Sequence, residues 1–211
     1  MIYTMNIMIA KRLIPICLIL ATAGCHSAPQ STYTETSIFN GQDLAGWKTP
    51  KYPECWIAKD GILTVTNNPE RKGENLSTVK HYRDFVCQLE FKFGAGTVDS
   101  GVFMRNDRDQ IQIGISGSLK RDMTASPYIP GKGYPVEAKG VKELLKLDDW
   151  NTLRIRAVGK TYTTWLNGAE VMSYTSASAV EEGPLGIQLH GGREMTIQYR
   201  DISVTELDSG E

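Results

Sequence analysis

The feature that most constrains the fold of this chain is a set of short segments in which apolar and polar residues alternate. Side chains of a β-strand point alternately to opposite faces of its sheet, so each segment can bury one face and keep the other polar. The polar positions carry carboxamide, guanidinium, imidazole and carboxylate groups. The clearest segments are Phe85–Phe93, Gly101–Arg105, Gln110–Ile115 and Leu185–His190. A sheet with such a polar face is a candidate binding surface.

The rest of the chain supports an all-β fold. From Ser37 onward the sequence reads as strands separated by turn residues, with little helical periodicity, which predicts a single-domain β-sandwich rather than an α/β enzyme. Asp60-Gly61 and Asn167-Gly168 each separate two strand-like segments, and these dipeptides favour tight hairpin turns. We therefore predict two β-hairpins, and we expect Met195–Leu207 to return and pair with an early strand.

One long segment does not read as strand. Ser116–Lys139 contains three prolines and several glycines. A loop of this length in a compact domain usually has a function or is flexible, so we assign it to the rim of a site. Lys120 and Arg121 can clamp the oxygens of a ligand there, although a solvated charge cluster explains them equally well. Tyr134 can stack on the apolar face of a sugar, and Val141–Leu147 is expected to form one short helical turn.

The N-terminal segment is typical of an export signal. Lys11 and Arg12 precede an apolar run over residues 13–23 that is too short to span a bilayer as a stable helix. The run leads into Ala-Gly-Cys25, which resembles a bacterial lipobox, with ordinary signal cleavage nearby as the alternative. We expect a lipoprotein signal peptide over residues 1–24, lipid attachment at Cys25, a tether over 25–36, the folded domain over 37–207 and a tail over 208–211. The protein would then be lipid-anchored to the bacterial cell envelope and face the periplasm or the cell surface.

Charge and cysteine content narrow the class of protein further. A formal net charge of −1 gives no reason to expect that the protein binds a polyanion, so nucleic acid is not a predicted partner. If Cys17 leaves with the signal and Cys25 carries lipid, only Cys55 and Cys87 remain in the domain. An oxidising compartment permits a disulfide between these two. Two buried free thiols are an equal alternative, because Cys87 falls on the apolar side of its segment.

A polar wall can be assembled from several of the alternating segments if their apolar residues share one core. The residues that then face away from the core are Arg105, Gln110, Gln112, Gln188 and His190, with Glu90 added if its strand is adjacent. Such groups donate and accept hydrogen bonds in fixed directions, which suits a hydroxyl-rich ligand and indicates a sugar site. The alternative is that these residues form the solvent-exposed outer face of a sheet and bind no ligand.

The sequence gives little sign of a metal or cofactor. No His or Cys spacing typical of a zinc site is visible, and no cofactor is predicted. Asp99, Asp107, Asp109 and Asp122 lack a recognised calcium-loop spacing, so we interpret them as surface aspartates. Binding of a divalent cation by their carboxylate oxygens stays an alternative.

Several short motifs occur in an order that resembles one known family. The motifs are Phe39-Asn40-Gly41, Trp56 with Asp60-Gly61, Asp84-Phe85, Asp99-Ser100-Gly101-Val102-Phe103-Met104-Arg105, Trp165-Leu166-Asn167-Gly168, Gly186-Ile187-Gln188-Leu189-His190-Gly191 and Tyr199-Arg200-Asp201. This order is similar to that of the 3-keto-glucoside 1,2-lyases and 3-keto-2-hydroxy-glucal hydratases, also called 3-keto-disaccharide hydrolases, over residues 36–207. The resemblance implies a concanavalin-like jelly-roll sandwich of two antiparallel sheets, export, and action on sugars already oxidised at C3. It also implies a partner oxidoreductase that makes the keto group.

Two positions depart from the family pattern. Asp99-Ser100-Gly101 stands where the family often has Asn-Ser-Gly, and Gln110 stands where it often has Glu two residues before a Gln. Replacing a carboxylate by an amide removes a potential base or metal ligand. The chemistry at position 110 is therefore expected to differ from that of the family.

The resemblance implies an elimination mechanism. A carbonyl at C3 acidifies the C2 proton, so a base can remove it while the C1 substituent leaves, unlike the two-carboxylate mechanism of ordinary glycosidases. We expect Glu90 or His190 to act as base or acid and Arg105 to stabilise the enolate. The residues expected to bind substrate are Gln110, Gln112, Gln188, Lys120, Arg121 and Tyr134. A carbohydrate-binding lipoprotein without turnover is the alternative, since jelly rolls host both functions.

Overall fold

The computed structural model describes Met1 and residues 33–208, and one compact unit begins at Tyr33. The expected signal peptide, the lipid site Cys25 and the tether up to residue 32 lie outside the described residues, as do residues 209–211 of the tail. None of the helices in the described part of the chain is long and apolar enough to cross a membrane.

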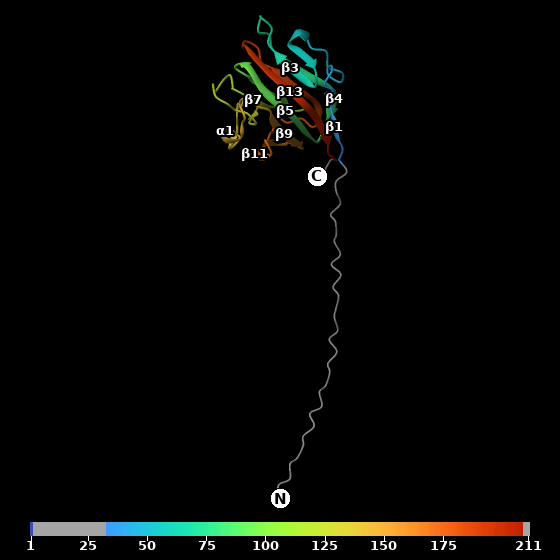
Figure 1. The fold of residues 1–211 in the computed structure, drawn as a ribbon, viewed down its shortest axis with the longest axis vertical. Coiled ribbons are helices and arrows are strands. Elements are labelled where there is room, and N and C mark those ends of the chain that lie inside the picture. Colours follow the sequence, from blue (N-terminus) through green and yellow to red (C-terminus); the bar gives the residue numbers. More distant parts are fainter. Residues whose placement is uncertain (2–32, 209–211) are drawn as a thin grey trace. The chain divides into compact units, whose positions relative to one another are not determined.

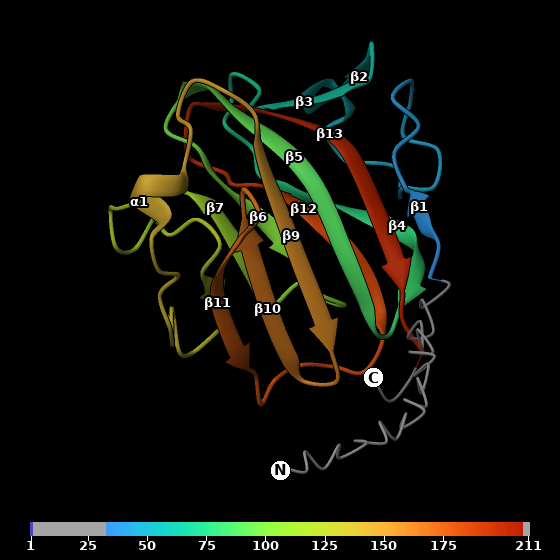
Figure 2. The same cartoon turned by 60° about the horizontal axis from the view of Figure 1, so that its bottom comes forward.

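The fold is a sandwich of two antiparallel sheets (Figure 1, Figure 2). The larger sheet consists, in spatial order, of β11 (Ala169–Thr175), β10 (Thr161–Leu166), β9 (Asn151–Val158), β5 (Phe85–Gly96), β13 (Met195–Glu206), β3 (Ile62–Thr66) and β2 (Trp56–Lys59), with β1 (Glu35–Ser37) paired to β13. The smaller sheet consists of β4 (Glu74–Tyr82), β12 (Gly183–Leu189), β6 (Asp99–Phe103), β7 (Gln110–Gly114) and β8 (Pro127–Tyr128). The predicted all-β jelly-roll sandwich is confirmed.

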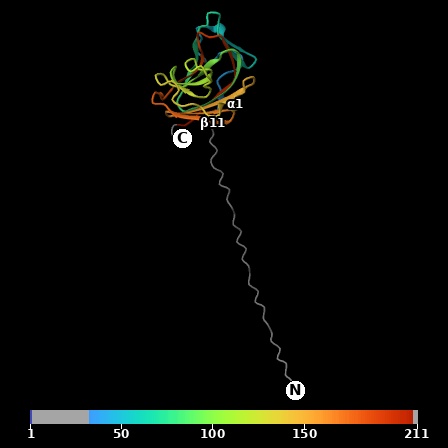
Figure 3. The same cartoon turned by 90° about the vertical axis from the view of Figure 1, so that its left-hand side faces the viewer.

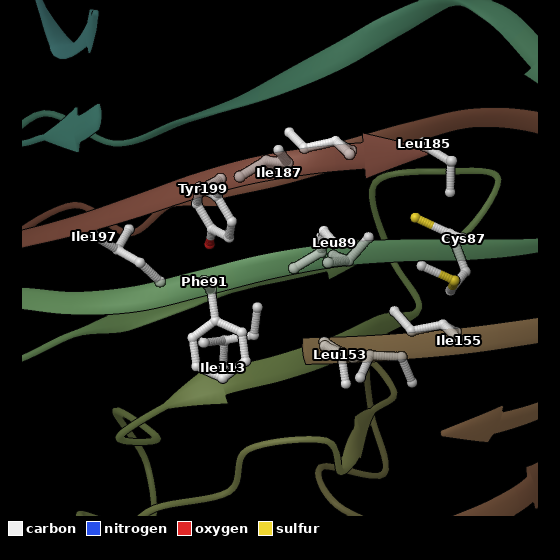
Figure 4. Close-up of a cluster of buried hydrophobic side chains, with 14 of the residues drawn as sticks. Cys87, Leu89, Phe91, Ile113, Leu153, Ile155, Leu185, Ile187, Ile197 and Tyr199 are labelled. Atoms are coloured by element: carbon white, nitrogen blue, oxygen red, sulfur yellow. The ribbon is translucent and has the colours of Figure 1, made fainter. Parts of the chain in front are cut away.

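The core lies between the two sheets and follows the predicted alternation. Leu89 and Phe91 of β5 are each at most 1% exposed and point toward the smaller sheet. Figure 4 shows them among Ile113 of β7 and Ile187 of β12. Because apolar side chains of both sheets meet here, the opposite face of the smaller sheet is left free to carry polar groups.

Both predicted hairpins are present. Asp60 and Gly61, with φ of 52° and 82°, connect β2 to β3, and Lys59 pairs with Ile62. Asn167 and Gly168, with φ of 50° and 88°, connect β10 to β11. Two successive residues with positive φ form the turn whose twist matches that of the flanking strands, which explains the Asp-Gly and Asn-Gly sequences.

The C-terminal strand connects distant parts of the chain, as predicted. β13 pairs with β5 on one side and with β3 and β1 on the other. Glu35 and Thr36, which the sequence assigns to the tether, are part of β1 because they pair with Thr205 and Val204. The folded domain therefore begins before residue 37.

Residues 116–139 form the predicted long loop between β7 and the short helix α1 (Val141–Leu144). Within this loop only β8 is a strand, supported by isolated bridges such as Ile115 to Asp122. The loop ends against β11, where the Lys139 amide donates to the Val171 carbonyl at 2.8 Å. Figure 3 shows α1 and β11 close together, and α1 supplies the expected helical turn.

The two cysteines of the domain do not form a disulfide. Cys55 ends the 3-10 helix η1 (Pro53–Cys55), Cys87 lies in β5, and both are buried free thiols. Burial raises the pKa of the Cys87 thiol to about 12. Of the two alternatives that the sequence leaves open, the structure has two buried free thiols, and Cys87 packs in the core between the sheets (Figure 4).

Candidate functional site

A cavity of about 730 Å³ lies on the face of the smaller sheet that points away from the core. Its floor comes from the polar positions of β6, β7 and β12, and its rim comes from the long loop. The residues that line it are Asp99, Gln110, Gln112, Ser116, Gly117, Ser118, Lys120, Tyr128, Tyr134, Gln188, His190, Gly191, Gly192 and Arg193. The alternating sequence of these strands therefore produces a polar cavity, and the long loop borders it.

The floor of the cavity depends on a glycine. Gly101 pairs with Gln112 across β6 and β7, and a Cβ atom at position 101 would lie 2.1 Å from Nε2 of Gln110. The missing side chain lets the Gln110 amide lie flat over β6. Gln110 and Gln112 are each only 3% exposed, so both side chains are packed into the floor of the cavity and are not part of the solvated surface.

Three glutamines and one aspartate form a hydrogen-bonded chain across the floor. Gln112 Nε2 donates to Asp99 Oδ1 at 2.8 Å. Gln110 Nε2 donates to Gln188 Oε1 at 3.0 Å and lies 3.4 Å from Gln112 Oε1. Because a carboxylate only accepts, Asp99 fixes the orientation of Gln112, and Gln112 in turn fixes that of Gln110. We call these four side chains the amide wall.

The amide wall ends at a cluster of charged groups. Oδ2 of Asp99 lies 2.9 Å from Nη2 of Arg193 and 3.7 Å from Nε2 of His190. The Asp99 side chain is 4% exposed, that of Arg193 is 17% exposed and that of His190 is 42% exposed. Gly117 packs over the ion pair of Asp99 and Arg193, since a Cβ atom at position 117 would lie 2.7 Å from Arg193 Nη2. The imidazole is therefore the most exposed member of this cluster, and Arg193 also borders the cavity.

His190 is held in one tautomer. Its Nδ1 lies 2.7 Å from the carbonyl oxygen of Gly191, and a carbonyl only accepts, so Nδ1 carries the hydrogen. Nε2 is then the nitrogen that gains or loses a proton, and it is the one that faces Asp99. The chain can bend back in this way at the end of β12 because Gly192 has a φ of 73°.

Two tyrosines form the side of the cavity. The rings of Tyr128 and Tyr134 meet edge to face, with centroids 5.3 Å apart. The pKa of Tyr134 is raised to about 12, mainly by burial, with a smaller contribution from the Asp99 charge, while a hydrogen bond with Ser116 acts in the opposite direction. The phenol of Tyr134 therefore keeps its proton at neutral pH and is available as a donor.

The structure brings six of the sequence-predicted site residues together and leaves three outside the cavity. Those that line it are Gln110, Gln112, Gln188, His190, Lys120 and Tyr134. Those that do not are Arg105, Glu90 and Arg121. The three corrections have separate physical reasons.

Arg105 is buried on the opposite side of the smaller sheet. Its guanidinium donates to the carbonyls of Ala157, Gly159 and Val180 at 2.9, 2.6 and 3.0 Å, and to Asp84 Oδ1 at 3.2 Å. β6 ends at Phe103 and Arg105 has a φ of +62°, so the alternation of faces no longer holds at residue 105. The prediction that Arg105 faces the ligand is wrong.

Glu90 and Arg121 lie elsewhere on the surface. Glu90 is in β5 of the larger sheet, where Oε2 lies 2.6 Å from Nη2 of Arg200. Alternation correctly placed its side chain away from the core but could not tell which sheet carried the strand. Arg121 makes two contacts with the carboxylate of Glu137, and both side chains are about half exposed, so the solvated-charge alternative describes it.

Sequence reasoning missed two members of the charged cluster. The expectation that Asp99 is a surface aspartate is wrong, because its side chain lies on the same face of β6 as positions 101 and 103 and is 4% exposed. For Arg193 the sequence offers one signal, its place directly after Gly191-Gly192. Within residues 33–208, no three His, Cys, Asp or Glu side chains are arranged to hold a metal ion.

Solved structures with the same fold include several carbohydrate-related proteins. A "putative glycosyl hydrolase" from Parabacteroides distasonis ATCC 8503 aligns with a TM-score of 0.62 and 20% identity, over 82% of this chain and 94% of that chain. The carbohydrate-binding module CBM66 from Bacillus subtilis aligns with a TM-score of 0.51 and 11% identity, over 79% and 98%. The exoplasmic/lumenal domain of VIP36, in its Ca²⁺/Man3GlcNAc-bound form, aligns with a TM-score of 0.58 and 11% identity, over 80% and 87%. At these identities the likeness shows the fold alone.

Sequence comparison gives the family. A comparison with curated proteins finds no match. The model of the family described as a 3-keto-alpha-glucoside-1,2-lyase-like domain matches residues 34–205, which is nearly the whole described fold. The chain therefore belongs to the 3-keto-alpha-glucoside-1,2-lyase-like domain family.

Proposed function

We propose that this protein cleaves or hydrates 3-keto-glycosides by removing or adding a proton at C2. The observation that carries the proposal is the cluster of His190, Asp99 and Arg193 at the end of the amide wall, inside a cavity of about 730 Å³. Cavities of this size accommodate small-molecule ligands. Family membership supports a carbohydrate-related role.

The reaction needs three groups. A base takes the C2 proton, and the electron pair of the C2–H bond moves into an enolate on the C3 oxygen. The enolate then reforms the carbonyl, the C1–oxygen bond breaks, and a C1–C2 double bond forms. A cation or hydrogen-bond donor must stabilise the enolate, and an acid must protonate the leaving oxygen. Hydration of the resulting glucal runs the same steps in reverse.

The cavity contains a candidate for each role. Nε2 of His190 is the reachable base, since Nδ1–H is held by Gly191. Arg193 replaces Arg105 as the cation for the enolate, and one such donor contributes about 3–4 kcal/mol in other enzymes. Tyr134, which keeps its proton at neutral pH, is the candidate acid for the leaving oxygen. The amides of Gln110 and Gln188 hold the sugar hydroxyls.

The cellular part of the proposal rests on the sequence. We propose that the protein is exported, anchored through lipid on Cys25 and located at the bacterial cell envelope. An oxidoreductase acting at sugar C3 would supply its substrate. No cofactor takes part in the proposed steps, and the question of a divalent cation is best addressed by assaying activity with and without a chelator.

The direct test is to incubate the purified protein with a 3-keto-glucoside and follow the absorbance of the conjugated enone. His190→Gln is expected to lower the rate about 10²-fold or more, because it removes the proton-accepting nitrogen. His81→Gln is the matched control, since His81 is exposed on β4 outside the cavity. Equal rates for both variants would remove His190 from the chemistry.

A second candidate function is carbohydrate binding without turnover. The specific observation that favours it is Gln110, an amide where the family often has an acid. Calorimetry with a 3-keto-glucoside, followed by analysis of the recovered sugar, separates the two functions. Binding with unchanged sugar supports the binding protein, whereas loss of the glycosidic bond supports the enzyme.

A further inference from the structure

We infer that Asp99 is a positioning residue that stabilises the protonated form of His190 during proton transfer. This inference rests on the proposed function, because it assigns a role in that reaction. Asp99 is the one carboxylate among the described residues that line the cavity. Its side chain is 4% exposed, so it acts through its neighbours rather than on the substrate.

The two oxygens of Asp99 have different surroundings. Oδ1 accepts from Gln112 Nε2 at 2.8 Å and is held by the amide wall. Oδ2 is buried, and it lies 2.9 Å from Nη2 of Arg193 and 3.7 Å from Nε2 of His190. The negative charge of Asp99 is therefore held beside the imidazole at a site with little exposure to solvent, where it stabilises a positive charge on the ring.

Proton abstraction places a positive charge next to this carboxylate. When the C2–H bond breaks, the proton bonds to Nε2 of His190 and the electron pair goes to the enolate. The imidazole then carries a positive charge, and its Nε2 lies 3.7 Å from Oδ2 of Asp99, so the carboxylate stabilises the ring by charge attraction. Return of the proton in the hydration direction removes this attraction. Asp99 thus stabilises the charge that His190 carries only during the reaction.

The amide wall holds the Asp99 carboxylate in one orientation. Gln188, Gln110 and Gln112 form a connected chain that ends on Oδ1, so Oδ2 stays directed toward Arg193 and His190.

The test compares turnover of a 3-keto-glucoside by the purified wild type and by Asp99→Asn, which keeps the shape and removes the charge. We expect kcat to fall about 10²-fold with KM changed less than about threefold, because the interaction forms only as the proton moves. Asp107→Asn, the same charge change on an exposed residue of the β6–β7 connection outside the cavity, should match the wild type.

Combination with His190→Gln separates this role from a structural one. Residues that act as a unit are not additive, so Asp99→Asn/His190→Gln should be no slower than the slower single variant. Additive losses, or unchanged kcat in Asp99→Asn, would overturn the inference while the proposed function stands. No turnover by the wild type would overturn both. If Asp99→Asn fails to fold, Asp99→Ser, which also removes the charge but places no amide against Arg193, is measured in its place, and unchanged kcat would overturn the inference.

Discussion

At the scale of single residues, the buried guanidinium of Arg105 stabilises the fold. Its guanidinium is 0% exposed and connects three backbone carbonyls with Asp84. Arg105→Ala leaves these acceptors buried without a donor. We expect the free energy of unfolding to fall by about 3–5 kcal/mol, measured by urea denaturation at neutral pH.

Arg154→Ala is the control for this prediction. Arg154 is exposed in β9, with its guanidinium carbon 5.3 Å from the ring centre of Trp165. An exposed contact of this kind contributes about 0.5–1 kcal/mol. A similar loss of unfolding free energy in both variants would show that the buried contacts of Arg105 stabilise the fold no more than an exposed contact does.

At the scale of strands, the contact between β6 and β7 determines the shape of the cavity floor. Gly101→Ala would place a Cβ atom 2.1 Å from Nε2 of Gln110 and displace that amide. We expect a loss of about 1–3 kcal/mol in unfolding free energy, together with weaker sugar binding measured by calorimetry. A Cβ atom at position 101 would also lie 2.6 Å from the Ile111 carbonyl oxygen, so Gly101→Ala/Gln110→Ala should recover only part of the stability and none of the binding. A double variant less stable than Gly101→Ala would contradict the proposed clash with the Gln110 amide.

Strand patterns explain which parts of the structure could be predicted. Alternation identified the core and polar faces of β5, β6, β7 and β12, and turn chemistry identified both hairpins, because these signals are local. It failed at Arg105, where the strand had already ended, and at Glu90, where the sheet carrying the strand depends on long-range pairing. Asp99 and Arg193 are 94 positions apart in the sequence and meet only through tertiary structure, so no local pattern could join them.

At the scale of the whole molecule, buried tyrosines make stability sensitive to high pH. Burial raises the pKa of Tyr134 to about 12 and raises the pKa of Tyr162 and Tyr199 above the usual value. The folded protein keeps these protons when the unfolded chain has lost them near pH 10, so stability present below that pH is lost as pH rises. We expect the urea midpoint to fall steeply between about pH 9 and about pH 11.5.

Tyr199→Phe tests the source of this fall. Tyr199 is fully buried and its hydroxyl lies 2.6 Å from that of Ser100, which also donates to the Gln188 carbonyl and so keeps a partner. The substituted protein should lose less stability over the same pH interval. Tyr174→Phe, at a partly exposed position of β11, should behave like the wild type. An unchanged slope for Tyr199→Phe would exclude this phenol as a contributor.

The position of β13 also governs when the larger sheet can be completed. β13 separates β5 from β3 and holds β1, yet it begins only at Met195. A nascent chain that lacks β13 has the larger sheet in two separate parts, and the edges of these parts carry unpaired amides and carbonyls. The larger sheet can therefore close only after β13 has been synthesised, and chains interrupted before it are the species most prone to aggregate through those open edges.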